Sequence, residues 1–349
     1  IALANSLRIA VDAMGGDVGP SVTVAALLAS LSKHNAASVL LFGDRPRLIA
    51  ELRDCKDASV LDRIEVRHCD VAVLDDDKPS TVVRHKQASS MGLAIKAVAD
   101  GEAGACISSG NTGALMALGM THLKTLPGIS RPAICGTFPT AHGRSYVLDL
   151  GANLDCSAEQ LVQFALLGSL TVTALDGIAE PTVGLLNVGS EQNKGGPVLG
   201  LAATLLANEP LLNYQGFVEG DGIFNGAANV VVCDGFSGNV ALKASEGVAR
   251  LIKVMAKQLF ATSALTRFAA VLLRGPFERL HFKLDPASYN GAYLLGLNGV
   301  VVKSHGGATE EGFTQALDVT IKAAKHKLPA LLLPILKQKL ARDKKTGAL

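Results

Sequence analysis

The chain has 349 residues, of which 48% are hydrophobic, 36 are glycine and none is tryptophan. This length allows one large α/β domain or two ordinary ones, and the shortage of aromatic residues fits close-packed α/β layers better than an all-β sandwich. The formal net charge is only +2, and no basic run alternates with aromatic residues, so we expect no nucleic-acid partner.

The longest apolar runs fall short of the roughly 20 residues that a membrane-spanning helix needs. No secretory signal precedes the first predicted strand. The six cysteines show neither a CxxC pair nor zinc-ligand spacing, and most of them lie in or beside apolar runs. We therefore expect reduced, buried thiols in a cytoplasmic protein that touches a membrane only at its surface.

The first third of the chain predicts strands that alternate with helices. Ser21 is the candidate N-cap of the first helix. The chain turns polar at 75–87, which we interpret as a surface loop whose Arg84, His85 and Lys86 are candidates for reaching a site. The predicted strands cover residues 8–14, 38–42, 64–67 and 103–107, and the predicted helices cover 22–31, 91–99 and 114–123.

The same alternation continues through the rest of the chain. Predicted strands cover residues 145–150, 182–188, 216–218, 230–232 and 300–302, and helices end near 174 and 206 or span 240–251. An apolar strand, a loop of Gly, Asn, Ser or Asp, and a helix thus recur at least five times. This pattern predicts a mostly parallel sheet with crossover helices, in which ligands bind beyond the carboxyl ends of the strands. We expect the polar loops to meet there.

The stretch 229–243 holds the strongest single candidate site. Its strand is followed by a loop and a helix start, and such a junction aims free N–H groups and a positive helix end at an anion. Taken alone, the stretch is more safely interpreted as an ordinary βα turn with a glycine for its tight geometry. The residues concerned are Asp234 and Gly235 after the strand, Gly238 and Asn239 at the opening of the helix, and Lys243 in its first turns.

Standard signatures of other enzyme classes are missing. The chain has no GxGxxG after its first strand, no Walker A sequence and no HExxH, and 235–238 is one residue short of a GxSxG elbow. Nicotinamide binding, serine hydrolysis and a metal site therefore have little support. Backbone amides, asparagines and a few lysines can instead bind an oxyanion without a metal.

Residues 250–283 carry seven Lys and Arg against one acid, interleaved with large apolar residues. This composition predicts a basic amphipathic hairpin of two helices that breaks near Gly275 and Pro276. Three roles stay open for it: contact with a bilayer, packing in a dimer, and covering the protein's own core.

The final predicted strand, 300–302, places Lys303, Ser304 and His305 at its carboxyl end, where the other loops converge. A lone histidine is more often structural than catalytic. Its position beside a lysine and a glycine makes His305 a candidate nevertheless.

Six motifs together resemble the PlsX family, the acyl-acyl carrier protein:phosphate acyltransferases of bacterial phospholipid synthesis. They span nearly the whole chain in the family's order. The resemblance departs at Ser109, where Ala is expected, and at Ser190, Gln192 and Asn193. The motifs lie at 12–20, 108–114, 149–155, 187–195, 234–243 and 290–306.

The resemblance implies a single large Rossmann-like α/β/α domain over 1–349, with a mostly parallel sheet, related in fold to phosphate acetyltransferases and to isocitrate and isopropylmalate dehydrogenases. It implies a homodimer that converts acyl-acyl carrier protein and inorganic phosphate into acyl phosphate, without a metal or organic cofactor. Such a protein works in the cytoplasm, touches the membrane surface, and passes its product to a glycerol-3-phosphate acyltransferase.

The resemblance also suggests roles for residues. We assign Lys194, Asn239 and His305 to phosphate binding and charge stabilisation, with Asp234 orienting one of them. The carrier protein or anionic lipid would meet Arg250, Lys253, Lys257 and Arg267. Cys156 is disfavoured as a nucleophile, because phosphate is itself the nucleophile. Further candidates for binding substrate or phosphate are Asp12, Gly15, Gly16, Ser108, Asn111, Thr112, Asn153, Glu191, Gly235, Gly238, Lys243, Asn290 and Lys303, with Asn111 and Asn153 as amide donors.

Three other functions compete with this one. A short-chain phosphotransacetylase using coenzyme A would not need the apolar basic segment. A metal-dependent decarboxylating dehydrogenase would need an acidic cluster for Mg²⁺, which the sequence lacks. A scaffold at the membrane surface would leave the glycine-asparagine loops without a purpose.

Overall fold

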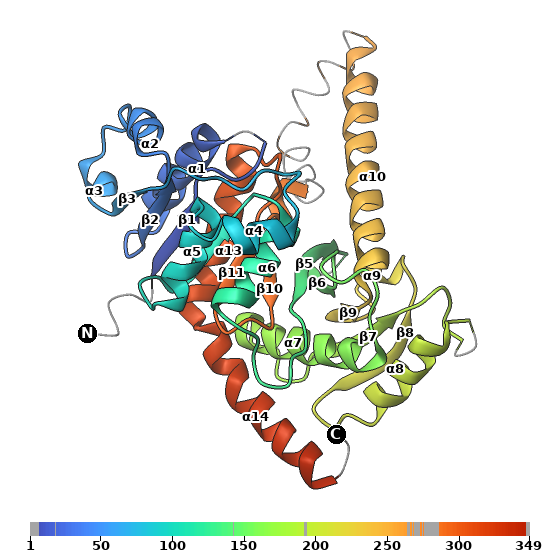
Figure 1. The fold of residues 1–349 in the computed structure, drawn as a ribbon. Coiled ribbons are helices and arrows are strands. Elements are labelled where there is room, and N and C mark those ends of the chain that lie inside the picture. The colour runs from blue at the N-terminus through green and yellow to red at the C-terminus, as the bar shows by residue number, and fades with distance from the viewer. Residues whose placement is uncertain are drawn as a thin grey trace.

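The computed structural model describes residues 7–17, 19–141, 143–191, 194–263 and 286–346, together with 266, 268, 273 and 275. In this part of the chain, one sheet of eleven strands runs through the molecule in the order β3-β2-β1-β4-β11-β10-β5-β6-β9-β7-β8 (Figure 1). The strands are β1 (Arg8–Asp12), β2 (Ser38–Gly43), β3 (Ile64–His68), β4 (Ala105–Ser108), β5 (Ala133–Thr140), β6 (Gly143–Leu148), β7 (Thr182–Leu186), β8 (Asn213–Val218), β9 (Val230–Val232), β10 (Ala292–Leu295) and β11 (Val300–Lys303).

Helices cover both faces of this sheet. On one face lie α1 (Pro20–Lys33), α2 (Arg45–Leu52), α3 (Ala58–Leu61), α7 (Ala158–Asp176), α8 (Pro197–Ala207), α13 (Glu310–His326) and α14 (Leu328–Thr346). On the other lie α4 (Pro79–His85), α5 (Ser90–Ala99), α6 (Thr112–His122), α9 (Gly222–Asn225) and the first turns of α10 (Gly235–Ala261), while the short 3₁₀ helix η1 (Pro286–Tyr289) precedes β10.

Alternation along the strands explains the two layers of core. Ile9 and Val11 of β1 join the first layer, whereas Ala10 between them joins the second. Successive side chains of a strand point to opposite faces, so a strand that is covered on both faces must be apolar throughout. The run Val230–Val232 is fully buried for this reason. The predicted α/β/α sandwich with a mostly parallel sheet is confirmed.

The middle of the sheet reverses its direction. Strand β10 is antiparallel to both β11 and β5, and β5 is antiparallel to β6. Consequently β6, β9, β7 and β8 run opposite to β1, β4 and β11. The expectation that all polar loops leave from one edge is therefore wrong, because their strands do not share one direction.

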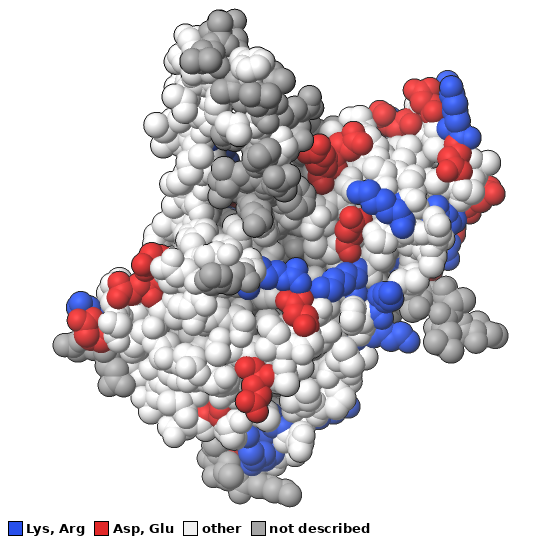
Figure 2. All heavy atoms as spheres, turned by 180° about the vertical axis from the view of Figure 1, so that it is seen from behind, with Lys and Arg blue, Asp and Glu red and all other residues white. Residues whose placement is uncertain are grey.

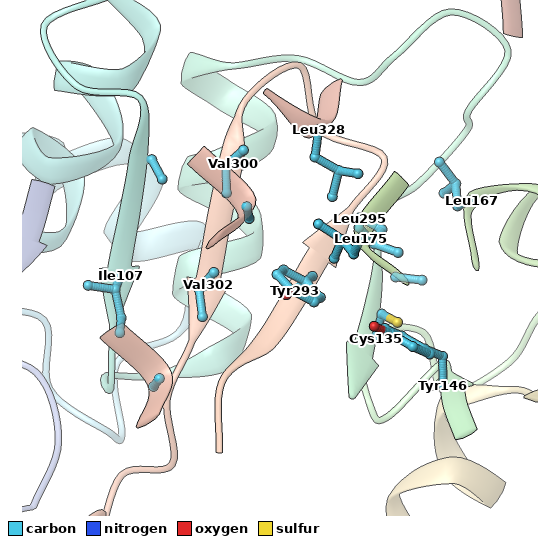
Figure 3. Packing of buried hydrophobic residues seen from close by; sticks show 14 of the residues in the cluster. Ile107, Cys135, Tyr146, Leu167, Leu175, Tyr293, Leu295, Val300, Val302 and Leu328 are labelled. Carbon is cyan, nitrogen blue, oxygen red and sulfur yellow. The ribbon is translucent and has the colours of Figure 1, made fainter. Parts of the chain in front are cut away.

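The reversal divides the sheet into two halves, one with β1, β4 and β11 and the other with β6, β9, β7 and β8. The strands β6 and β11 of the two halves nevertheless end at the same level of the sheet. Leu148, the last residue of β6, pairs with Cys135 of β5, which pairs with Tyr293 of β10. Tyr293 in turn pairs with Val302, next to the end of β11. Figure 3 shows this buried row with Ile107 of β4 on one side and Tyr146 on the other. The loops after β6 and after β11 thus begin at the same level and leave in opposite directions.

Several local predictions need correction. Strands β5 and β10 were not predicted, and α4 occupies part of the expected surface loop at 75–87. Helix α1 begins at Pro20 after Gly19, so Ser21 is not its N-cap. Helix α10 begins at Gly235 rather than near 238–240 and continues to Ala261. The predicted hairpin break near Gly275 and Pro276 lies outside the described residues.

Helix α7 is long and apolar enough to cross a membrane by length and composition, and 67% of that stretch is buried inside this fold.

The C-terminal helix α14 continues through Pro334 and forms ion pairs with Glu209, just beyond the end of α8. The buried carboxylate of Glu209 lies 3.0 Å from Lys339 Nζ and accepts from Arg342 at 2.9 Å. The tail therefore packs on the first layer of helices (Figure 1).

Candidate active site at the ends of β1, β4 and β11

Three neighbouring parallel strands, β1, β4 and β11, end side by side, and their loops are joined by hydrogen bonds. Ser108 Oγ donates to Asp12 Oδ2 at 2.7 Å, and Ser109 Oγ donates to the Gly15 carbonyl at 2.8 Å. The Asp17 N–H donates to the Gly306 carbonyl at 3.0 Å. We call these three hydrogen-bonded loops, which follow β1, β4 and β11, the rim of the site.

Glycine allows these loops to approach so closely. A Cβ on Gly15 would lie 2.6 Å from the Gly110 nitrogen, and one on Gly16 would lie 2.8 Å from the Gly306 carbonyl oxygen. Gly16 also has a φ of 86°, which side-chain-bearing residues rarely adopt. The predicted phosphate-binding glycines thus serve the packing of three loops.

Asp12 lies beneath this rim, with 1% of its surface exposed. Burial raises the pKa of its carboxyl group, although hydrogen bonds from Ser108 and from the Met14 N–H oppose that rise. Because Asp12 is enclosed, we interpret it as a structural residue that holds the loop after β4 through Ser108. Its charge also acts on Lys303, whose pKa it raises.

His305 and Lys243 meet above the rim. Nζ of Lys243, from α10, lies 3.4 Å from His305 Nε2, in the loop after β11. The Gly307 N–H donates to His305 Nδ1 at 3.1 Å. Nδ1 is therefore the acceptor, and the proton of a neutral imidazole must sit on Nε2. Two N–H donors thus face each other, an arrangement that an anion's oxygen would satisfy.

Lys303 supplies a third cation. Its Nζ donates to the carbonyl of Ser109 at 3.0 Å and to the carbonyl of Ser304. Burial and the positive charge of Lys243 lower its pKa to about 8, against the opposing effect of the acids Asp75, Asp12 and Asp17. The cost of burying this ammonium would be reduced by a bound anion.

The pKa of His305 is lowered for similar reasons. Partial desolvation acts first, then the ammonium groups of Lys243 and Lys303, while the carboxylates of Glu246 and Asp17 oppose them. Crowding of like charges at one place is typical of binding sites for the opposite charge. Lys243, Lys303 and His305 together form the cation cluster.

The three asparagines predicted to bind substrate or phosphate are already hydrogen-bonded within the protein. Asn111 caps α6 by accepting from the Ala114 N–H, and its amide donates to the carbonyls of Asp75 and Asp77. Asn153 is buried and donates to Pro132 and Asp149, while Arg131 donates to its oxygen. The Asn290 amide donates to Ser304 Oγ and to the Gly312 carbonyl, and its oxygen accepts from the His305 N–H. These residues shape the loops and leave no amide N–H for a ligand.

The start of α10 is also occupied. Asp234 caps the helix by accepting from the Ser237 N–H at 2.7 Å. The Gly235 N–H donates to Asn153, and the Gly238 N–H donates to Asp234. A Cβ on Gly238 would lie 1.9 Å from the Asp149 carbonyl oxygen, so this glycine lets α10 rest on the loop after β6.

The remaining predicted site residues lie outside the loop that carries His305, and Asn239 precedes Lys243 by one turn of α10. Lys194 pairs with Glu191 at 2.8 Å, and both side chains are about half exposed. Asn239 lies alongside Gly151, and Thr112 is the first residue of α6. Among the described residues, no hydrogen bond or ion pair joins Lys194, Asn153 or Asn239 to His305, so their shared role with His305 stays a prediction.

The projecting half of α10 carries the predicted basic contacts. Arg250, Lys253 and Lys257 are exposed there, whereas Arg267 lies outside the described residues. Val248, Leu251, Ile252, Met255 and Leu259 are also exposed and follow helical spacing along one stripe, with the basic residues on the opposite side. Seen from behind, the part of this helix that grey atoms leave open shows almost no charged residues (Figure 2).

Two further observations limit the chemistry. Within the described residues, no group of three His, Cys, Asp or Glu side chains could hold a metal ion. Burial, aided by the charge of Asp149, raises the pKa of the Cys156 thiol to about 12, which disfavours a thiolate nucleophile.

One residue of this site was missed from the sequence. Glu246 is buried on α10 and pairs with Lys243 at 3.0 Å. The spacing of Lys243, Glu246 and Arg250 along one helix face was the available signal.

The fold is similar to that of solved phosphotransacetylases. EutD phosphotransacetylase from Staphylococcus aureus aligns with a TM-score of 0.58 at 16% identity, covering 91% of this chain and 94% of that chain. A phosphotransacetylase from Streptococcus pyogenes aligns with a TM-score of 0.59 at 17% identity, with the same coverage. At such low identity, the likeness establishes the fold alone.

Sequence comparison defines the family. A family model described as fatty acid synthesis protein matches residues 7–331. The phosphate acyltransferase of Nitrosococcus oceani is 48% identical over 93% of this chain and 95% of the relative, and that of Shewanella amazonensis is 47% identical over 94% and 96%. The chain belongs to the PlsX family and is a phosphate acyltransferase of fatty acid and phospholipid synthesis.

Proposed function

We propose that this phosphate acyltransferase takes its fatty acyl group from acyl-acyl carrier protein and transfers it to inorganic phosphate, which the cation cluster holds. The observation that carries the proposal is the approach of His305 Nε2 and Lys243 Nζ to 3.4 Å, with both atoms acting as donors. A phosphate oxygen accepts from both at once. Lys303 adds charge from below.

The reaction needs little beyond positioning and charge. A phosphate oxygen attacks the thioester carbonyl carbon, the new C–O bond forms, and the C–S bond breaks to release the carrier thiolate. Holding the nucleophile in place removes most of the entropy cost of the encounter. Fixed donors stabilise the negative charge that develops on the tetrahedral intermediate. We assign this second task to Lys303 and the first to His305 and Lys243.

The choice of a carrier protein as acyl donor is supported by the basic side of α10. Arg250, Lys253 and Lys257 follow Lys243 on the same helix, 7, 10 and 14 residues further on. At about 1.5 Å per residue, they lie roughly 10–20 Å from it along the axis. An acidic carrier would be attracted to these side chains and would deliver its tethered acyl group toward the cluster.

The direct test supplies purified protein with palmitoyl-acyl carrier protein and phosphate and follows free carrier thiol together with acyl phosphate. Acetyl-coenzyme A is assayed in parallel, and faster turnover of it would establish the short-chain alternative instead. His305→Gln and Lys243→Gln should each lower kcat/KM for phosphate about 100-fold, because a misplaced nucleophile costs a factor of that order. Lys96→Gln on the exposed surface of α5 is the control and should behave as wild type.

The same assay decides the assignments that stay predictions. Lys194→Ala and Asn239→Ala should abolish acyl phosphate formation if these residues bind phosphate. Near-normal turnover in either variant rejects its assignment and leaves the cation cluster as the phosphate site.

We also propose that the apolar stripe of α10 pairs with its copy in a homodimer. Five exposed apolar residues at i, i+3, i+4, i+7 and i+11 form the narrow seam that two helices bury against each other. Leu251→Glu with Met255→Glu should convert a dimer to a monomer in analytical ultracentrifugation. A chain that is monomeric before the change would overturn the pairing. Flotation with anionic vesicles only when the stripe is intact would show instead that the stripe meets a membrane.

A further inference from the structure

Glu246 is the one carboxylate that touches the cation cluster from α10. Only 8% of the residue is exposed. Its Oε2 accepts from Lys243 Nζ at 3.0 Å and lies 3.7 Å from Arg250 Nη1. The carboxylate therefore sits between two cations on one helix face.

Lys243 needs such a partner because its position beside His305 is unfavourable in the free enzyme. The lysine side chain is half exposed, and the atom it faces is a donor. Without an anion between them, solvation and side-chain entropy would draw the ammonium group away. The hydrogen bond to Glu246 opposes this loss.

We propose that Glu246 is a positioning residue that holds Lys243 beside His305, so that the phosphate site is assembled before phosphate arrives; this rests on the proposed function of the cluster. Arg250 shares the carboxylate and offsets its charge, which keeps Glu246 from repelling phosphate. Lys243 keeps two of its three N–H donors for the ligand. Preorganisation of this kind improves binding more than the chemical step.

The test compares Glu246→Gln, Glu246→Asp and Lys243→Gln in the carrier-protein assay. Glu246→Gln should raise KM for phosphate about tenfold, change kcat at saturating phosphate by less than about twofold, and leave KM for the acyl donor unaltered. Glu246→Asp, which keeps the charge on a shorter side chain, should recover part of the phosphate affinity. The control Asp100→Asn breaks an exposed i,i+4 pair with Lys96 at the C-terminal end of α5 and should change none of these values.

A double-mutant cycle separates positioning from general support of the fold. If Glu246 acts through Lys243, adding Glu246→Gln to Lys243→Gln should change KM for phosphate by less than about twofold. The proposal is overturned if the two changes act additively on KM for phosphate. It is also overturned if Glu246→Gln keeps the wild-type KM while Lys243→Gln is impaired. A wild-type KM in Lys243→Gln overturns the proposed phosphate site itself.

NMR titration of His305 supplies a readout without turnover. The charged groups facing this imidazole in the described residues are Lys243 and Glu246 from α10, Lys303 from β11 and Asp17 from the loop after β1. Glu246 acts to raise the pKa of His305, and Lys243 acts to lower it. If Glu246 holds Lys243 in place, Glu246→Gln removes the first effect and weakens the second, so it should lower the pKa of His305 less than the same change does in Lys243→Gln protein, where only the first effect is lost. Equal shifts in the two proteins would contradict the proposed arrangement.

Discussion

Lys303 is the residue whose protonation should be visible in the kinetics. It is the last residue of β11, is partly buried, and donates to two carbonyl groups. Its remaining N–H, and its charge, are available to an anion only while the group is protonated. Because burial and the neighbouring Lys243 lower its pKa to about 8, the enzyme should lose this charge at a pH where an ordinary lysine keeps it.

We therefore expect kcat/KM for phosphate to fall as the pH rises through about 8, because this ratio reports groups of the free enzyme. Lys303→Met should lower the ratio at neutral pH and abolish the fall. The measurement is a pH series from 6.5 to 9.5 at subsaturating phosphate, analysed for both proteins. A decline that persists unchanged in Lys303→Met would assign it to another group.

At the scale of elements, the start of α10 depends on close approach between a helix and a loop. Gly→Ala inside a helix is normally stabilising by roughly 0.5–1 kcal/mol. At Gly238 the added Cβ would meet the Asp149 carbonyl oxygen at 1.9 Å and Cys233 Sγ at 2.9 Å. Backbone atoms cannot move aside cheaply, so the steric conflict should outweigh the gain in helix propensity.

Gly238→Ala should consequently destabilise the protein by about 2 kcal/mol or more, within the usual cost of overpacking. Gly247→Ala in the same helix is the matched control, because nothing lies within 4 Å of its Cβ position. It should be neutral or stabilising. Differential scanning calorimetry of both variants measures the contrast, and equal melting temperatures would refute the tight contact.

The elements that the sequence did not reveal have physical reasons for being missed. Strand β5 includes Gly136 and Pro139, and β10 has only four residues within a glycine-rich stretch. Each pairs with the next strand along the chain, and the two also pair with each other from distant parts of the sequence, a contact that no local period marks. The strand–loop–helix units were predicted because each carries its own apolar run and turn residues. Missing β5 and β10 meant missing the reversal of direction that they produce.

The candidate site was predicted unevenly for a related reason. Lys303 and His305 follow a recognisable strand, and their place at its carboxyl end can be read locally. The approach of Lys243 to His305 depends on how α10 crosses from the end of β9 to the end of β11, which no local pattern encodes. The amide groups of Asn111 and Asn153 are consumed by partners that lie 21 to 36 residues away in sequence and, for Asn153, also by Asp149, which is four residues away.

At the scale of the whole molecule, the two halves are joined by charge as well as by the sheet. Asp176 at the end of α7 accepts from Arg144 Nε at 3.1 Å, from Tyr146 OH at 3.0 Å and from Lys322 Nζ of α13 at 3.3 Å. Burial alone would raise the pKa of Asp176, but the hydrogen bond and charge of Arg144, with help from Tyr146 and Lys322, lower it. The ionised carboxylate thus stabilises the contact between β6, α7 and α13.

Asp176→Asn should lower the free energy of unfolding by about 1–2 kcal/mol at pH 7. This value allows for screening of the ion pairs by solvent, because the side chains of Arg144 and Lys322 are more than one-third exposed. A lowered pKa in the folded state gives stability that is fully present above the unfolded pKa of about 3.9 and is lost as the pH falls through the folded value. The difference between wild type and Asp176→Asn should therefore be constant from pH 7 to about 5 and shrink at lower pH. Urea titrations across this range measure it, with Asp100→Asn on α5 as a surface control. A gap that widens on acidification would show that the ionised form of Asp176 does not hold the halves together.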